Sequence, residues 1–455
     1  MFNKTIAAIS TAYGKGGVAI IRISGDEALL VAKKMLRLKS DNIEPRRAFY
    51  CEILSDNEVI DDGILTYFKG PNSFTGEDVC EICCHGGIYV TRAVLQSAYA
   101  SGAQPATAGE FTRRAYINGK LTLSRAEAIG NVIDAKTDAQ MRLSSSQARG
   151  ILSSKIEKIR QSILNSISHA YATIDYPDED IEPAEREQMS ECLDLVISSL
   201  EELKKSYRAG RAVSEGIKTA IIGKPNAGKS SVYNMLLGQE AAIVTDIAGT
   251  TRDVIESTLS LGGVTLNIAD TAGIHDTQDK VEKIGIERAK ARASEAELLL
   301  CVFDSSQRES DEDEYIIECA SGKSAIAIIN KSDKASQLSR EFEDKLLSKF
   351  SHVVSVSAKN CEGAGELGDI VSKMYDLGDI NLSSDAVISN ARAFSSVSLA
   401  LEKALDAKEA LLLGQTPDII CFALENALCE LDMIDGRGAS EEIVNTIFSR
   451  FCVGK

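Results

Sequence analysis

Residues 223–230 read Gly-Lys-Pro-Asn-Ala-Gly-Lys-Ser, and this stretch decides the fold of the middle of the chain. A short strand-like run at 218–222 precedes it and predicts a buried strand, and the run that follows it predicts a helix. In a glycine-rich loop between a strand and a helix, backbone N–H groups surround phosphates. Lys229 would reach the β and γ phosphates, and Ser230 would bind Mg²⁺. The pattern predicts a nucleotide-binding α/β domain.

Four further segments follow this loop in the order expected for a guanine-nucleotide site. Thr250 and Thr251 would lie in a switch that reaches Mg²⁺, and Asp-Thr-Ala-Gly at 270–273 follows a predicted strand. Asp333, in the Asn-Lys-Ser-Asp of 330–333, would accept two hydrogen bonds that guanine offers and adenine does not. Ser-Ala-Lys at 357–359 would close over the base. We therefore expect GTP rather than ATP, bound by Asn226, Ala227, Gly228, Lys229, Ser230, Ser231, Thr245, Asp246, Ile247, Ala248, Gly249, Thr250, Thr251, Asp270, Thr271, Ala272, Gly273, Asn330, Lys331, Asp333, Ser357, Ala358 and Lys359.

The residue after this Asp-Thr-Ala-Gly is Ile274, where Ras has the glutamine that orients the attacking water. Hydrolysis therefore needs another way to place water and to neutralise charge. A slow GTPase that depends on a partner protein is the alternative that the residues leave open.

The spacing of apolar residues indicates several domains. Short strand-like runs alternate with helical runs before residue 120 and predict a compact α+β unit. The stretches 124–174, 183–209 and 391–451 are helical in pattern, and the first carries a stripe of apolar residues three and four apart: Leu152, Ile156, Ile159, Ile163 and Ile167.

Between the helical stretches, short buried strands alternate with helices, which is typical of a doubly wound α/β domain. Gly262 and Gly263 predict a hairpin and the one antiparallel pair of its sheet. We expect a multidomain protein with an α+β domain at 1–119, a helical domain at 120–215 and 379–455, and a Ras-like α/β P-loop domain inserted at 216–378.

Composition narrows the class of protein. The chain has 455 residues, of which 44% are hydrophobic and 26% charged, so two or three globular domains are expected. A formal net charge of −17 argues against a surface that binds nucleic acid everywhere, although a local basic patch remains compatible with it. Eleven scattered cysteines fit reduced thiols better than a disulfide framework, and no apolar run is long enough for a bilayer. These features predict a soluble cytoplasmic protein.

The chain resembles the MnmE (TrmE) family of tRNA-modification GTPases over essentially its full length. The stretches 17–25, 71–78 and 109–112 carry the resemblance in the N-terminal part. Residues 245–253 and 284–289 carry it in the middle, and the final Phe-Cys-Val-Gly-Lys carries it at 451–455.

This resemblance implies an N-terminal folate-binding domain through which the protein forms a homodimer. It also implies an FAD-dependent partner of the MnmG (GidA) type, with which the family adds an aminomethyl-type (carboxymethylaminomethyl) group to C5 of the wobble uridine of certain tRNAs. The one-carbon donor would be 5-formyl- or 5,10-methylene-tetrahydrofolate. By matching position, the folate would contact Arg22, Glu81, Lys120 and Lys455.

The resemblance further implies that K⁺ takes the part of an arginine finger, with Asn226, Thr245, Ile247 and Thr250 as its ligands. A monovalent cation beside the phosphates would offset the charge that grows in the transition state, and would let two GTPase domains meet across the dimer. Glu282 matches the family residue that helps to orient water. His275 stands where the family usually has arginine, so no role is carried over to it.

For several residues the sequence allows both a functional and an ordinary structural explanation. Cys80, Cys83, Cys84 and His85 suggest a metal site, but strand alternation places Cys83 on the opposite face from the other two cysteines, so buried thiols are expected. Cys452 is a candidate catalytic nucleophile or thiol relay, or it packs near the folate pocket. The acidic runs 178–180 and 311–314 predict a solvated turn and an exposed helix start.

Two other functions stay open on the sequence. A ribosome-assembly or checkpoint GTPase carries the same nucleotide motifs without modification chemistry, but it would usually append a basic RNA-binding module. A folate-binding regulator that never transfers carbon is the second of these alternatives.

Overall fold

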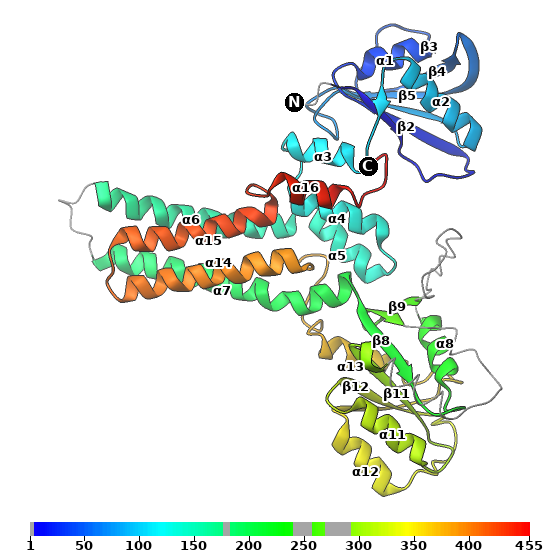
Figure 1. The fold of residues 1–455 in the computed structure, drawn as a ribbon, viewed down its shortest axis with the longest axis vertical. Helices are drawn as coiled ribbons and strands as arrows, with labels where there is room; N and C mark the ends of the chain where they lie inside the picture. The colour runs from blue at the N-terminus through cyan, green and yellow to red at the C-terminus, as the bar shows by residue number, and fades with distance from the viewer. Residues whose placement is uncertain (1–3, 176–182, 240–256, 269–292) are drawn as a thin grey trace. The chain divides into compact units, whose positions relative to one another are not determined.

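The computed structural model describes residues 4–175, 183–239, 257–268 and 293–455 (Figure 1). The chain divides into two compact units. The first contains Met1–Gly130 and Asp432–Lys455, and the second contains Asn131–Leu431. The predicted multidomain class is confirmed, and the predicted domain limits stay predictions.

A seven-stranded sheet of order β3-β4-β5-β6-β2-β1-β7 forms the centre of the first unit. Neighbouring strands are antiparallel except β1 and β7, which are parallel. Helices α1 (Ala28–Met35) and α2 (Ile88–Ala100) share a hydrophobic core with alternate residues of the strands. The strands are β1 (Ile6–Ile9), β2 (Val18–Ser24), β3 (Leu36–Leu38), β4 (Ala48–Ser55), β5 (Glu58–Phe68), β6 (Val79–His85) and β7 (Gln104–Pro105).

The rest of the first unit is helical. Helix α3 (Glu110–Ile117) contacts α16 (Glu441–Phe448), and Leu123 at the start of α4 (Leu123–Asp134) packs with Phe448. Beyond α16, Val453 forms an antiparallel bridge with Ala108. Two segments more than 300 residues apart therefore lie side by side in this unit.

The second unit contains a bundle of long helices, α6 (Ile151–Asp175), α7 (Pro183–Ser214), α14 (Ala391–Leu412) and α15 (Pro417–Asp435), which run alongside one another (Figure 1). The shorter α5 (Asp138–Ala148) packs on α6 and α7. All five residues of the predicted apolar stripe are buried in α6, which confirms its helical periodicity. The acidic run at 178–180 lies outside the described residues.

A six-stranded sheet of order β13-β12-β11-β8-β10-β9 completes the second unit. Its described strands are parallel except for the β9–β10 hairpin, as Gly262 and Gly263 predict. Both faces are buried against helices, which explains the continuous apolar runs. The elements are β8 (Ile217–Ile222), α8 (Lys229–Gln239), β9 (Ser257–Leu261), β10 (Val264–Ile268), β11 (Leu298–Asp304), α11 (Asp311–Ala320), β12 (Ser324–Asn330), α12 (Arg340–Lys349), β13 (His352–Val356) and α13 (Ala364–Met374).

Among the residues that the structure describes, no helix has the length and apolarity needed to cross a membrane.

Candidate functional site

The phosphate loop connects the end of β8 to the first residue of α8, Lys229. Asn226 has φ +61° and Gly228 has φ +95°, so the loop turns through the left-handed region twice. Asparagine is one of the few residues with a side chain that tolerate this conformation. At Gly228 a Cβ would overlap the Asn330 side-chain amide, so glycine is required there for close packing as well as for φ.

The end of β12 and the loop that follows it bond the backbone of the phosphate loop. Asn330, only 2% exposed, donates from Nδ2 to the Ala227 carbonyl at 3.0 Å. Its Oδ1 accepts from the Ala358 backbone N–H at 3.2 Å. One side chain therefore joins three segments that the sequence assigns to the phosphates, the base and the base-closing loop.

Lys331 makes a second connection to the same loop. Its Nζ donates to the Asn226 carbonyl at 3.0 Å and to Oδ2 of Asp304, the last residue of β11, at 2.5 Å. Burial raises the pKa of Asp304, but hydrogen bonds from Lys331 and Ser306 outweigh it and hold that pKa below its usual value. The carboxylate is thus charged and fixes the lysine.

Lys229 donates from Nζ to the carbonyls of Gly223 and Lys224, at 2.9 Å each. Its ammonium therefore lies beside the first residues of the phosphate loop, next to the backbone that would surround phosphates. Ser230 follows it in the first turn of α8, and Ser231 is exposed.

The predicted base-binding side chains also meet. Asp333 is exposed, and its Oδ1 accepts from the hydroxyl of buried Ser357 at 3.0 Å. Ala358 is nearly buried, whereas Lys359 is exposed. The carboxylate predicted to read guanine therefore lies beside the loop predicted to cover the base.

Many of the predicted site residues lie outside the described part of the chain. They are the switch residues Thr245, Asp246, Ile247, Ala248, Gly249, Thr250 and Thr251, the segment Asp270, Thr271, Ala272 and Gly273, and Ile274, His275 and Glu282. Their roles stay predictions.

Arg22 and Glu81, two of the four predicted folate residues, face each other on adjacent strands of the first unit. Arg22 Nε donates to Glu81 Oε1 at 3.0 Å, and the Arg22 guanidinium lies 5.4 Å from the Phe74 ring centre and 5.6 Å from that of Phe111. A charged pair flanked by two aromatic rings suits a flat polar heterocycle.

The other two predicted folate residues adjoin this pair through neighbouring backbone. Lys120 Nζ donates to the Pro71 carbonyl at 2.9 Å, three residues before Phe74. The Phe111 N–H donates to the Lys455 carbonyl at 3.1 Å. Lys120 thus bonds the loop that carries Phe74, and Lys455 bonds the backbone of Phe111.

Beneath this cluster lies an ion network that the sequence analysis missed. Arg114 is only 1% exposed and pairs with Glu77 at 3.0 Å and with Glu110 at 2.8 Å. Burial raises the pKa of Glu110, but hydrogen bonds from Thr107 and Arg114 outweigh it and lower that pKa. Glu77 also accepts from Ser24 at 2.8 Å, in the strand that carries Arg22. The one available signal was the presence of Glu77 and Glu110 within stretches that carry the family resemblance.

The segment 452–455 lies against the first unit's sheet and α3. Ser10 Oγ donates to the Gly454 carbonyl at 3.0 Å, and the Gly109 N–H donates to the Cys452 carbonyl at 3.4 Å. Gly454 has φ +98°, and a Cβ there would overlap the Ile9 carbonyl. These contacts fix the backbone of Cys452 and leave its side chain exposed.

The cysteines of β6 follow the predicted alternation. Cys80 and Cys84 are buried and Cys83 is half-buried. Burial raises the pKa of the Cys80 and Cys84 thiols to about 12, so both are neutral thiols near pH 7 and poor metal ligands.

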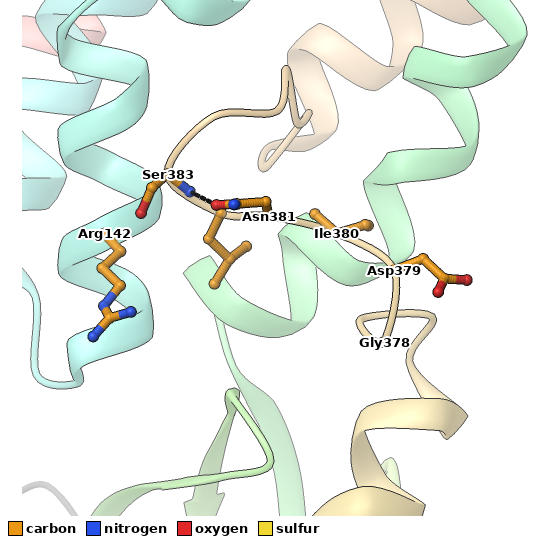
Figure 2. Close-up of a pocket in the computed structure, with 7 residues that line it drawn as sticks. Arg142, Gly378, Asp379, Ile380, Asn381 and Ser383 are labelled. Carbon is orange, nitrogen blue, oxygen red and sulfur yellow. Dashed lines mark hydrogen bonds between the residues drawn. The ribbon is translucent and has the colours of Figure 1, made fainter.

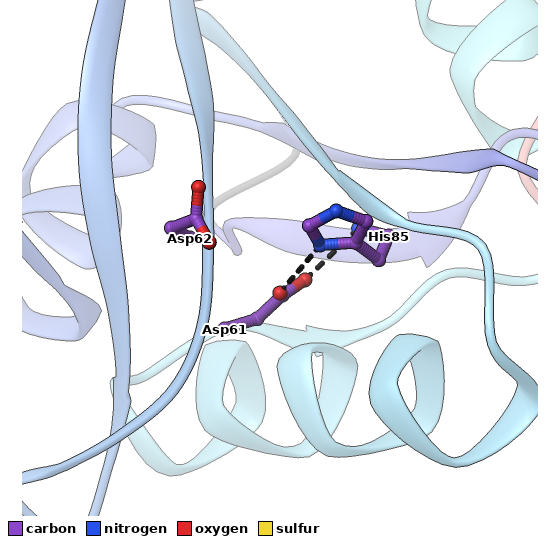
Figure 3. A group of neighbouring side chains, drawn as sticks. All are labelled: Asp61, Asp62 and His85. Carbon is purple, nitrogen blue, oxygen red and sulfur yellow. Dashed lines mark hydrogen bonds and ion pairs between the residues drawn. The ribbon is translucent and has the colours of Figure 1, made fainter.

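His85 pairs instead with an aspartate of the neighbouring strand. Its Nδ1 lies 2.7 Å from Asp61 Oδ1, with Asp62 close by (Figure 3). A hydrogen bond with Asp61 raises the pKa of His85. The ion pair engages Nδ1, one of the two ring nitrogens of His85.

A pocket of about 400 Å³ lies in the second unit beside the segment that follows the six-stranded sheet (Figure 2). Arg142 of α5 and residues 378–383 line it. The Ser383 N–H donates to Asn381 Oδ1 at 3.0 Å, so the segment is folded on itself. None of the predicted site residues lines this pocket.

One expectation about surface charge is wrong. The acidic start of α11 was expected to be exposed, and Asp311 is, but Asp313 is 1% exposed and pairs with Lys224 of the phosphate loop. The partner lies 89 residues away in the chain, where a helix-start pattern gives no sign of it.

Comparisons with known proteins agree with this architecture. Residues 123–452 match the family model "MnmE helical domain", and residues 5–120 match "GTP-binding protein TrmE N-terminus". The chain is 41% identical over 460 residues to the tRNA modification GTPase MnmE of Clostridioides difficile, covering 100% of this chain and 99% of the relative. It is 40% identical to the protein of the same name from Thermoanaerobacter pseudethanolicus, with 100% of both chains covered.

Among solved structures, the G domain of the T. maritima FeoB iron transporter matches 34% of this chain and 97% of its own, with 24% identity and a TM-score of 0.26. The full-length similarity to the curated relatives, together with the two matching models, establishes the relationship. The chain belongs to the MnmE family of tRNA-modification GTPases.

Proposed function

We propose that this protein hydrolyses GTP to drive modification of the wobble uridine of tRNA. The observation that carries the proposal is the position of Asn330, which bonds Ala227 of the phosphate loop and Ala358 of the base-closing loop at once. That arrangement joins the two segments that we propose contact the phosphates and the base.

Guanine specificity rests on Asp333. Its exposed carboxylate, oriented by Ser357, is an acceptor for the N1–H and the amino group of guanine. Adenine presents an acceptor at the first of these positions, so the carboxylate would repel it. GTP is therefore the proposed substrate.

Catalysis requires charge neutralisation at the β and γ phosphates. Mg²⁺, held by Ser230 and Thr251, and K⁺, held by Asn226, Thr245, Ile247 and Thr250, would supply it when bound. Among the described residues, none bonds the side chain of exposed Asn226, whose backbone carbonyl already accepts from Lys331. Its amide oxygen therefore suits a cation ligand. Glu282 would orient the water.

The first unit would bind the folate donor. Arg22 and Glu81 present hydrogen-bonding groups between Phe74 and Phe111, and the buried Arg114 network below fixes α3 and the 71–78 loop in place. Lys120 and Lys455 would add positive charge for the carboxylates of a folate tail. Cys452, with its thiol exposed, is proposed to act in the modification chemistry.

Homodimerisation through this unit is also proposed. Residues paired across β4, β5, β6 and β2 place Tyr50, Ile64, Cys83 and Ile20 on one face of the sheet. Val18, two residues before Ile20 in β2, lies on the same face. Tyr50 is 55% exposed and Val18 62% exposed, so this apolar face is open to a second copy. The FAD-dependent MnmG-type protein and tRNA would then bind the dimer.

The test is a complementation experiment. Wobble uridines in tRNA from cells that lack this protein should lose the carboxymethylaminomethyl-type mass, and the wild-type gene should restore it. A Lys229→Ala gene should fail, because the phosphate-binding ammonium is gone. Unmodified-level masses in the wild-type complement would refute the function.

A further inference from the structure

A buried ion pair joins the phosphate loop to a helix that takes no part in the nucleotide motifs. Asp313, in the first turn of α11, accepts from Lys224 Nζ at 2.7 Å. The two side chains are 2% and 8% exposed. Removing two charges from water is costly, so a pair this deeply buried needs a compensating reason to be there.

Asp313 is also held by the N-cap residue of its own helix. Its Oδ2 also accepts from the backbone N–H and the hydroxyl of Ser310, the N-cap of α11, at 3.0 and 3.1 Å. Its Oδ1 is buried and bonds no group among the described residues. Lys224 is therefore the one cation that compensates this carboxylate within the described part of the chain.

Lys224 is connected to the nucleotide site through its backbone. Its carbonyl accepts from Lys229 Nζ at 2.9 Å and from the Ala227 N–H at 3.3 Å. The side chain of Lys224 also donates to the Arg308 carbonyl at 3.4 Å. The ammonium of Lys224 is thus fixed by the α11 segment. Its backbone carbonyl is fixed by Lys229 and by the turn that would bind phosphates.

We infer that the Lys224–Asp313 ion pair is a positioning device that preorganises the phosphate loop for nucleotide binding. Lys224 does not touch phosphate in this arrangement, because its ammonium is committed to a buried carboxylate. It acts by fixing the backbone turn between Gly223 and Ala227 before the nucleotide arrives. A loop that is already ordered loses less entropy on binding, which increases affinity. The inference rests on the proposed nucleotide site.

The competing explanation is a pair that stabilises only the fold. The two are separable because a neutral pair of similar volume often replaces a buried ion pair without loss of stability, whereas one unpaired buried charge is strongly destabilising. Lys224→Met/Asp313→Asn keeps both volumes and keeps an acceptor for Ser310, but it removes the tether. Lys345→Met is the matched control. It removes an ion pair with Glu314, the neighbour of Asp313 in α11, and does not alter the phosphate loop.

The experiment measures binding of fluorescent N-methylanthraniloyl-GDP, thermal unfolding and GTP turnover on the full-length chain. For the double variant we expect an unchanged midpoint of unfolding, Kd and KM about tenfold higher, and kcat within about threefold of wild type. Lys224→Arg, which can pair with Asp313 again, should bring Kd back to within about threefold of wild type. Lys345→Met should leave Kd and kcat unchanged.

A stable double variant with wild-type Kd would overturn the inference and leave the pair a purely structural one. So would a Kd that stays tenfold high in Lys224→Arg while the protein is folded. Failure of the proposed function looks different, because wild-type protein would then not turn over GTP in KCl with Mg²⁺ at all. The GDP-binding comparison remains informative in that case.

Discussion

Substitutions at Asn226 distinguish the contribution of its side chain to catalysis from the contribution of its backbone conformation to the loop. Asn226 has φ +61° in the phosphate loop, and its carbonyl accepts from Lys331. Removing the side chain therefore deletes a proposed K⁺ ligand without deleting the loop's anchor. Alanine also carries a penalty of about 1 kcal/mol in the left-handed region, which glycine does not.

Two different effects follow, and their sizes differ. Losing a preorganised transition-state charge costs about 3 kcal/mol, or about a hundredfold in turnover. The backbone penalty of alanine adds about 1 kcal/mol to forming the loop, or about fivefold in nucleotide affinity. Asn226→Gly should thus lose the K⁺ response with near-normal affinity, and Asn226→Ala should lose the response and bind a few-fold more weakly.

The assay is GTP turnover in matched KCl and NaCl for wild type, Asn226→Gly and Asn226→Ala, with GDP affinity measured alongside. Wild type should be strongly stimulated by K⁺ and poorly by Na⁺. Equal wild-type rates in both salts would refute the potassium mechanism and favour a slow GTPase that needs a partner. A normal K⁺ response in Asn226→Gly would remove Asn226 from the ligand set.

Three further predictions test other parts of the chain. Asp333→Asn should shift preference from guanosine to xanthosine nucleotides in competition binding, since the amide supplies a donor where the carboxylate accepted; an unchanged preference would remove Asp333 from base recognition. Arg22→Ala and Lys120→Ala should weaken calorimetric binding of 5-formyltetrahydrofolate to the full-length protein at least tenfold and leave GDP affinity intact, because the two sites lie in different units; equal folate heats would exclude the proposed pocket. The raised pKa of His85 means that its ion pair with Asp61 stabilises the fold at pH values just below the ordinary histidine value of 6.5, and that this contribution is lost as pH rises through the raised folded-state pKa. The lowered pKa of Asp61 means that the contribution is lost again only in acid. His85→Gln should therefore flatten the fall of the thermal midpoint as pH rises above 6.5, and a parallel fall in both proteins would contradict the pairing.

The sequence predicts those parts of the fold whose cause is local. Runs of three to six consecutive apolar residues mark β8, β11 and β12 because a parallel sheet covered on both faces disfavours polar positions. The stripe in α6 follows from helical periodicity. The hairpin follows from two adjacent glycines between strand-like runs, and both Gly262 and Gly263 have positive φ angles in the structure. The phosphate loop belongs to the same class, because its chemistry fixes residue types at fixed spacings.

What the sequence does not predict depends on partners far along the chain. Burial of Asp313 depends on Lys224, and burial of Arg114 depends on Glu77, 37 residues away. The bridge between Ala108 and Val453 joins segments with no shared pattern. A charged residue is predicted to be exposed unless its ion-pair partner is known. Local sequence patterns therefore predict that Asp313 lies on the surface.

The two candidate sites have one physical feature in common, which explains why motifs reveal them only in part. In each, a buried ion pair lies one layer behind the groups that would meet the ligand: Lys224–Asp313 behind the phosphate loop, and Arg114 with Glu77 and Glu110 behind Arg22. A ligand-binding loop needs exposed donors, so it lacks the apolar contacts that would otherwise hold it rigid. A charged pair in low dielectric supplies strong, directional restraint without occupying the ligand's place. Replacing such a pair should therefore change affinity while the ligand-contacting residues remain intact, which motif matching alone would not anticipate.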